Sequence, residues 1–137
     1  MDTQSYKIGK SAATSSELQI QGICFQWAWN TYANTRRLLF HVPNGGKRSK
    51  VEAAWLKSSG VISGIPDLLL VWGKTIHAFE MKTEKGTVSD AQAAVHKAWA
   101  TQGIIVHIVR TVDDFKRIFL NIIEGRDPAS GGCRRPF

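Results

Sequence analysis

The sequence predicts an α/β protein with a mixed β-sheet and helices on both of its faces. Two extended runs, Leu68–Trp72 and Thr75–Lys82, flank Gly73-Lys74, and a two-residue turn of this kind closes an antiparallel hairpin. A helical pattern over about Asp90–Gln102 leads to another extended run, Ile104–Val109, and such a crossover joins parallel strands of one sheet. The expected order is therefore α-β-α-β-β-α-β-α, with the second hairpin strand in the middle of the sheet.

Three elements are expected before the hairpin. Thr14-Ser15-Ser16-Glu17 has the spacing of a capping box and predicts the start of a helix. Arg36–Val42 resembles a first strand, and Pro43-Asn44-Gly45-Gly46 after it predicts a turn. Lys47–Ser59 has helical character, and Gly60 is expected to end this second helix. Residues at helical intervals along the first helix are Leu18, Gln21, Phe25, Ala28, Trp29 and Tyr32.

The end of the chain predicts one more helix and a tail. Thr111 is expected to open the last helix. Residues 1–13 are polar and lack periodicity, whereas residues 125–137 are rich in Gly, Pro and Arg, so we expect a flexible leader and a disordered basic tail. A single domain over residues 14–124 lies between them. The inner side of the last helix is expected to carry Phe115, Ile118, Phe119, Ile122 and Ile123.

The composition is typical of one folded domain that needs no disulfide bonds. With 137 residues and 43% hydrophobic content, the chain can bury a core. Cys24 and Cys133 lie far apart and lack metal-ligand spacing, so neither a zinc site nor a disulfide framework is predicted. No apolar run is long enough to span a bilayer. We therefore expect a cytoplasmic protein that does not contact membranes.

The charge balance points to a polyanionic partner. The chain has 18 Lys and Arg against 11 Asp and Glu, a formal net charge of +7. No segment has the extended basic amphipathic pattern of a membrane-surface helix, so nucleic acid is the expected partner.

The register of the hairpin places two acidic residues together. If Gly73-Lys74 is the turn, paired residues have numbers summing to 147, and Asp67 lies opposite Glu80. Lys82 falls on the same face. Because two like charges so placed repel, a compensating cation is expected: a divalent metal bound by both carboxylates, or Lys82 in a salt bridge at the sheet end.

These residues belong to a recognisable pattern. The sequence resembles the VRR-NUC (virus-type replication-repair nuclease) domain of the PD-(D/E)XK nuclease superfamily, over roughly residues 16–119. The matching features, in chain order, are Glu17 in a first helix, His41-Val42-Pro43-Asn44-Gly45-Gly46, Gly64-Ile65-Pro66-Asp67, Glu80-Met81-Lys82, and Ser89 three residues before Gln92.

The resemblance implies a restriction-endonuclease-like core and phosphodiester hydrolysis that depends on Mg²⁺ or Mn²⁺. By the same resemblance, Asp67, Glu80 and the Met81 backbone carbonyl would be the metal ligands, with Glu17 as a possible further one. Lys82 would orient the attacking water or stabilise charge on the phosphate. Gln92 would hold Lys82 or the water in position.

The resemblance also implies the substrate and the assembly. Small members of the family act as homodimers on branched DNA such as four-way junctions, with no small-molecule cofactor beyond the metal. The segment Asn44-Gly45-Gly46-Lys47-Arg48 combines small residues with two cations, so it is either a phosphate-binding loop or an ordinary glycine turn. The expected function is thus a structure-selective DNA endonuclease.

Other interpretations remain open at this point. Glu17 and Gln92 each occupy the third position of a capping box, so each would serve either the site or its own helix end, but not both. The fold could also be a non-catalytic nucleic-acid-binding module, or a basic structural subunit. His96 lacks metal-ligand spacing and is given no role. Trp27 lies out of phase with its helix and is expected at an interface.

Overall fold

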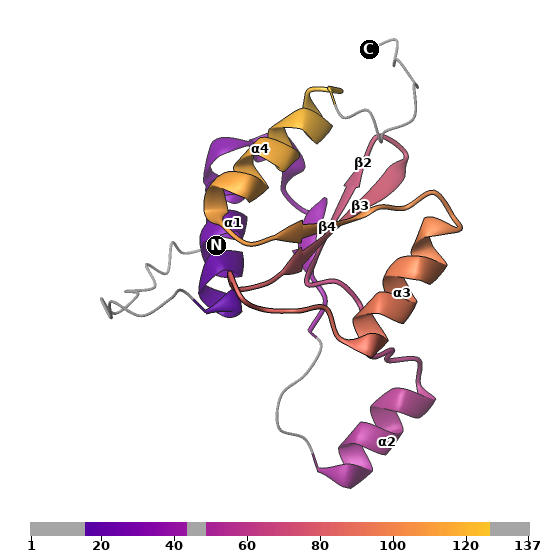
Figure 1. Cartoon of the computed structure of the whole chain (residues 1–137). Coiled ribbons are helices and arrows are strands. Elements are labelled where there is room, and N and C mark those ends of the chain that lie inside the picture. Colours follow the sequence, from indigo (N-terminus) through magenta and orange to yellow (C-terminus); the bar gives the residue numbers. More distant parts are fainter. Residues whose placement is uncertain (1–15, 44–48, 127–137) are drawn as a thin grey trace.

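The computed structural model describes residues 16–43 and 49–126, which form a four-stranded sheet in the order β1-β2-β3-β4 (Figure 1). The predicted leader, the segment Asn44–Arg48 and the tail from Asp127 onward lie outside the described residues. The predicted fold class is confirmed. The element bounds are α1 Glu17–Thr31, the 3₁₀ helix η1 Ala33–Thr35, β1 Leu39–His41, α2 Lys50–Ser58, β2 Leu68–Trp72, β3 Thr75–Met81, α3 Asp90–Ala100, β4 Val106–Val109 and α4 Val112–Ile123.

The hairpin has the predicted turn and register. β2 pairs antiparallel with β3 from Leu68 with Phe79 to Trp72 with Thr75, so the sum of 147 holds throughout. Gly73 and Lys74 both have positive φ, 71° and 60°, as in the type I′ turns that suit the twist of hairpins. β3 also pairs in parallel with β4, which places β3 inside the sheet as expected.

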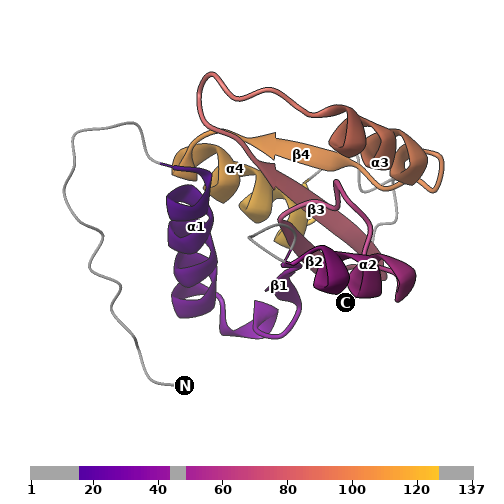
Figure 2. The same cartoon turned by 90° about the horizontal axis from the view of Figure 1, so that it is seen from below.

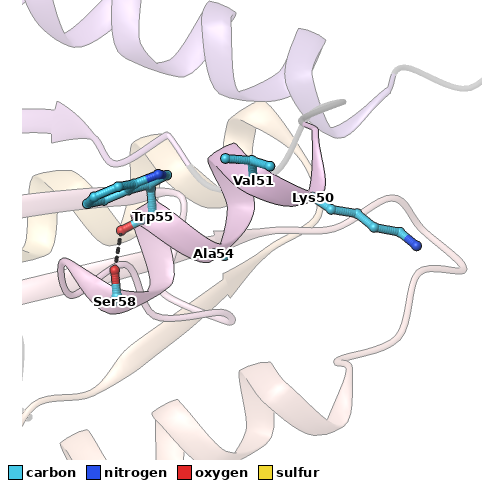
Figure 3. A pocket seen from close by; sticks show the side chains of 5 residues that line it. All are labelled: Lys50, Val51, Ala54, Trp55 and Ser58. Atoms are coloured by element: carbon cyan, nitrogen blue, oxygen red, sulfur yellow. Dashed lines mark hydrogen bonds between the residues drawn. The ribbon is translucent and has the colours of Figure 1, made fainter.

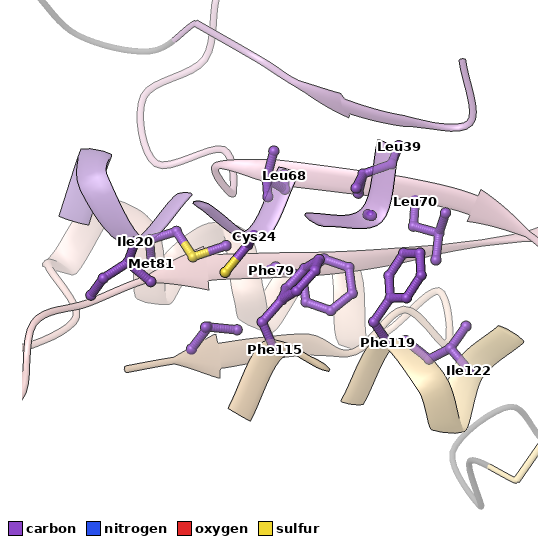
Figure 4. Packing of buried hydrophobic residues seen from close by; sticks show 12 residues of the cluster. Ile20, Cys24, Leu39, Leu68, Leu70, Phe79, Met81, Phe115, Phe119 and Ile122 are labelled. Carbon is purple, nitrogen blue, oxygen red and sulfur yellow. The ribbon is translucent and has the colours of Figure 1, made fainter. Parts of the chain in front are cut away.

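The two faces of the sheet have different partners. In Figures 1 and 2 the sheet separates α3 from α1 and α4. The face toward α1 and α4 carries the main core, where Phe115 and Phe119 of α4 pack against the strands (Figure 4). The strand residues of that face, all fully buried, are Leu68, Leu70, Phe79 and Met81. Their alternation leaves Glu80 and the residue two places on, Lys82, for the α3 side.

The start of the first helix and the extent of the first strand differ from the prediction. The capping box of α1 is formed by Ser16 and Gln19, not by Thr14 and Glu17, because the Ser16 hydroxyl accepts from the Gln19 N–H and the Gln19 side chain accepts from the Ser16 N–H. The first strand is shorter than expected, since η1 and the positive φ of Arg37, 68°, turn the chain before Leu39. Glu17 is therefore free of the capping role.

Two tryptophans, Trp27 and Trp55, lie in environments that differ from those expected. Trp27 is wrong as an interface candidate: its ring packs edge-on against Tyr32, at 5.4 Å between centroids, and against Phe119, at 5.6 Å. Trp55 on α2 is instead 72% exposed, and α2 has no buried residue (Figure 3). The helical pattern of α2 indicated its apolar side but not whether another element covers it. No helix in the described ranges is long and apolar enough to cross a membrane.

Candidate active site at the end of the hairpin

Asp67 and Glu80 meet where the hairpin joins the rest of the chain. Asp67 directly precedes β2, and its Oδ2 accepts a hydrogen bond of 2.7 Å from the N–H of Met81, the residue after Glu80. The Glu80 side chain is only 1% exposed. Burial raises the pKa of Glu80, and Asp67 raises it further through its charge and through a hydrogen bond between the two carboxyl groups. The structure thus brings together the two acids that the register placed opposite each other.

Helix α3 supplies two hydrogen bonds to the buried acid. Gln92 Nε2 donates to Glu80 Oε1 at 2.9 Å, and His96 Nε2 lies 3.3 Å from Glu80 Oε2. Each carboxylate oxygen of Glu80 therefore has a partner on α3. The pair holds the side chain in one orientation toward Asp67.

Gln92 serves the helix and the site at the same time. Its Oε1 accepts from the Ser89 N–H at 2.9 Å, which closes the capping box of α3, while its Nε2 donates to Glu80. The prediction that these two roles exclude each other was wrong, because the two ends of an amide point in different directions. The start of α3 and the orientation of Glu80 depend on one side chain.

His96 is the site residue that sequence reasoning missed. It lies four residues after Gln92 and therefore on the same face of α3. That spacing was a usable signal once Gln92 had been assigned to the site. Burial and the nearby charge of Lys82 lower the pKa of His96 below its usual value of 6.5, which favours the neutral ring.

Glu80 is an unusual carboxyl group in this environment. Burial, followed by the charge and hydrogen bond of Asp67, raises its pKa from 4.5 to about 8, and the charge of Glu17 acts in the same direction. Lys82 opposes these effects. Without a further cation, ionising Glu80 next to Asp67 is therefore unfavourable near neutral pH.

Lys82 is a buried cation at the same end of the sheet. Its side chain is 6% exposed, and its backbone N–H donates to the Val109 carbonyl of β4 at 2.9 Å. Among the residues that the structure describes, no hydrogen bond or ion pair within 4 Å is made by its ammonium group. The salt bridge from Lys82 to one carboxylate, which the sequence left open as the alternative to a metal, is thus not formed, and the ammonium group keeps its hydrogen-bonding capacity.

Glu17 and the Met81 carbonyl border the carboxylates. The Met81 N–H points toward Asp67, and the carbonyl of a strand residue points to the same side as its N–H, so the Met81 oxygen also faces the Asp67 side. Glu17 is exposed at the start of α1, close enough for its charge to act on Glu80. Its Oε1 lies 3.4 Å from the place that a Cβ on Gly86 would take.

Arg110 holds the loop that carries Gly86. Its Nη1 donates to the carbonyls of Thr83, at 2.7 Å, and of Gly86, at 2.8 Å. This guanidinium therefore fixes the chain that leaves β3 beside Glu17. Nothing in the sequence marked Arg110, because its partners are backbone carbonyls more than twenty residues away.

Gly64 brings the hairpin and α3 into contact. Its φ is +90°, and a Cβ at this position would lie 2.4 Å from the Ala91 carbonyl oxygen and 2.7 Å from the Gln92 nitrogen. Only glycine allows both the backbone conformation and this approach. The loop before Asp67 can therefore touch the first turn of α3, which places Gln92 next to Glu80.

The donor set fits a hard divalent cation. In residues 16–43 and 49–126, no three His, Cys, Asp or Glu side chains gather as a metal cluster. Mg²⁺, however, is commonly bound by one or two carboxylates, with water and substrate oxygens completing its shell. Asp67 and Glu80 are two such carboxylates, and their mutual repulsion, visible in the raised pKa of Glu80, would be relieved by a cation.

The segment from Asn44 to Arg48 is expected to be either a phosphate-binding loop or a glycine turn. Asn44, Gly45, Gly46, Lys47 and Arg48 lie outside the described residues. The structure does connect the strand before them to the site, since His41 Nδ1 lies 2.6 Å from the Asp67 carbonyl oxygen. Because a carbonyl only accepts, Nδ1 is the protonated nitrogen of this ring.

Comparison with known proteins identifies the family and the fold. The sequence model of the VRR-NUC domain matches residues 10–113. A solved structure described as a VRR_NUC domain protein superposes with a TM-score of 0.69 at 18% sequence identity, covering 82% of this chain and 91% of that one. At this identity the likeness concerns the fold. A search of curated proteins finds no match.

The contact at Gly64 can be tested by adding one methyl group. Gly64→Ala is expected to lower the free energy of unfolding by more than the about 1–3 kcal/mol of a strained backbone, because the new Cβ also meets α3. Gly60→Ala is the matched control, since Gly60 has φ +109° but no atom within 4 Å of the added Cβ. Equal losses in urea denaturation would show that the approach to α3 is unimportant.

The raised pKa of Glu80 predicts a pH dependence of stability in the presence of chelator. The folded state binds this proton more tightly than the unfolded state, so the stabilisation is complete below pH 4.5 and is lost as the pH rises toward about 8. The free energy of unfolding should fall by up to about 1.4 kcal/mol per pH unit across this window. Glu80→Gln should remove that decline, whereas Glu84→Gln, at an exposed site, should retain it. Parallel curves for wild type and Glu80→Gln would contradict the assignment.

Proposed function

The chain belongs to the VRR-NUC domain family, a nuclease family, and from this premise we propose that it is a metal-dependent, structure-selective DNA endonuclease that cleaves branched DNA such as four-way junctions. The observation that carries the proposal is the meeting of a buried carboxyl group, Glu80, a half-buried one, Asp67, and a buried lysine, Lys82, at the end of a single hairpin. Two ionised carboxylates so close together are unfavourable in the free protein. Phosphodiester hydrolysis is a reaction that uses such a pair, together with a cation.

The proposed cation is Mg²⁺ or Mn²⁺. The residues that would hold it are Asp67, Glu80 and the Met81 carbonyl, with Glu17 close enough to take part directly or through water. When bound, such a metal polarises a phosphate and lowers the pKa of a bound water. The protein's own contribution is to hold each carboxylate in one orientation: the Met81 N–H donates to Asp67, and Gln92 and His96 contact Glu80.

Lys82 is the proposed contact for the phosphate. Its ammonium group is buried and has no ion-pair partner among the described residues, so a phosphate oxygen can accept a hydrogen bond from it. In a low-dielectric site, a cation so placed stabilises the charge that develops on the phosphate during hydrolysis. Gln92 does not contact Lys82 in the way the sequence suggested; it acts on Glu80 instead.

The assembly that suits this function is a homodimer. One chain holds one pair of carboxylates, whereas resolving a four-way junction requires cuts in two strands, so two copies would supply the two sites. The net charge of +7 favours binding of the DNA backbone.

The proposal is tested by incubating the purified chain with four-way junction, flap and linear duplex DNA, in Mg²⁺, Mn²⁺ or chelator. Glu80→Gln and Lys82→Ala should each lower the cleavage rate by about 100-fold, because the first removes a charged ligand of the proposed metal and the second removes the cation at the reacting phosphate. Glu84→Gln and Lys85→Ala alter exposed residues of the following loop and should leave the rate unchanged.

Binding without cleavage of any DNA, in either metal, would contradict catalysis and indicate a non-catalytic nucleic-acid-binding module. Cleavage that survives Glu80→Gln would show that this site is wrong. Preference for linear duplex over the junction would contradict structure selectivity alone.

A further inference from the structure

Helix α2 is exposed on all sides, and the proposed chemistry does not use it. In Figure 1 it lies below the sheet, apart from the helices that cover the two faces. None of its nine residues is buried, and Val51 and Trp55 are 67% and 72% exposed. A helix this short gains little stability in water from its own hydrogen bonds, so a contact on its surface would stabilise it.

One side of α2 is an apolar stripe that carries no charge. The stripe consists of residues at the spacing that places side chains on one side of a helix: Val51, Ala54, Trp55 and Ser58. With Lys50 they line a shallow hollow (Figure 3). Within the described ranges, only α2 itself lines this hollow, so the Trp55 ring is accessible to a ligand.

Positive charge borders the stripe. Lys50 and Lys57 are exposed and seven residues apart, so both lie along the same edge of the stripe. Glu52, the one acidic residue of the helix, lies along the other edge. In the sequence, residues 47–59 contain four basic residues and one acidic residue, so this short stretch carries +3 of the net charge of +7. An accessible aromatic ring beside cations is the combination with which proteins hold unstacked bases and their phosphates.

A short connection joins α2 to the candidate active site. Gly64, which touches the first turn of α3, lies six residues after Ser58, and six residues span roughly 20 Å at most. Gly64 is three residues before Asp67. Since base steps are about 3.4 Å apart along a DNA strand, this distance corresponds to about six of them. DNA held at the carboxylates can therefore also reach α2.

Charge favours DNA over a second copy of the chain as the partner of α2. Two copies that met through this helix would bring together two stretches of net charge +3, which opposes association. The phosphates of DNA carry the opposite charge. Branched DNA also exposes the faces of bases where its strands part, and an apolar side chain can insert there.

We propose that α2 binds the substrate DNA where its strands part, with the Trp55 ring stacked on an exposed base and with Lys50 and Lys57 on the adjoining phosphates. The inference rests on the proposed nucleic-acid function and adds the surface that distinguishes branched DNA from linear duplex.

The first test measures binding to a four-way junction and to a linear duplex in chelator, where cleavage cannot interfere. Fluorescence anisotropy should show that Trp55→Ala weakens binding of the junction by about tenfold, the effect of losing one base stack, and weakens binding of the duplex much less. Ile105→Ala is the matched control. Ile105 is also exposed, at 47%, but lies at the end of β4 remote from Glu80, so this variant should bind both DNAs as wild type does.

The second test concerns the phosphate contact. Lys57→Gln should make the salt dependence of junction binding shallower, lowering the slope of log affinity against log salt by about one. Lys97→Gln is the matched control, because Lys97 is likewise an exposed basic residue in the last turn of its helix. It should keep the wild-type slope.

Thermal unfolding separates binding from folding. Trp55→Ala should unfold at the same temperature as wild type, since the ring is exposed and alanine favours a helix. A lower unfolding temperature would show that the ring packs within the chain, which would overturn the inference.

The remaining outcomes distinguish this inference from the proposed function. If the wild-type chain cleaves junction DNA in Mg²⁺ but Trp55→Ala binds both DNAs as wild type does, the contact at α2 is overturned and the nuclease stands. If Trp55→Ala turns a dimeric chain into a monomer in sedimentation, α2 binds a second copy and the inference is overturned. A wild-type chain that neither binds nor cleaves any DNA would overturn both.

Discussion

The pairing of β2 with β3 is the constraint on which the site depends. A two-residue turn at Gly73-Lys74 sets the register, and that register places Glu80 beside Asp67 and directs Lys82 to the same face. A slip of one residue would move Glu80 into the apolar cluster under α1 and α4. Packing of the core therefore stabilises this register, because Phe79 and Met81 are fully buried on one face only if the charged residues lie on the other.

The second constraint is the attachment of α3 to the hairpin. Gly64 lets the loop before Asp67 touch the first turn of α3, and Gln92 in that turn binds both its own helix cap and Glu80. Helix initiation and orientation of the acid are thus coupled through one side chain. His96, one turn further along, binds the other oxygen of Glu80. These contacts hold a carboxyl group whose ionisation the surrounding protein opposes.

Much of this arrangement was predictable because it follows from local patterns. The turn at Gly73, the parity of Glu80 and Lys82, and the cap at Thr111 are each determined by residues a few positions apart. The features that were missed depend on long-range packing. The pattern of α2 resembles that of any amphipathic helix, and only the structure shows Trp55 exposed. Arg110 binds carbonyls of a distant loop, which no sequence spacing reveals.

The central claim is that Asp67 and Glu80 form one cation site whose proton is displaced when the cation binds. Isothermal titration of Mg²⁺ at pH 7, in two buffers with different ionisation enthalpies, measures binding and proton release together. Since the pKa of Glu80 is raised to about 8, the wild-type chain should bind Mg²⁺ and release about one proton, and Glu80→Gln should lose both. Mg²⁺ binding of equal affinity in Glu80→Gln, or binding without proton release in the wild type, would contradict the account.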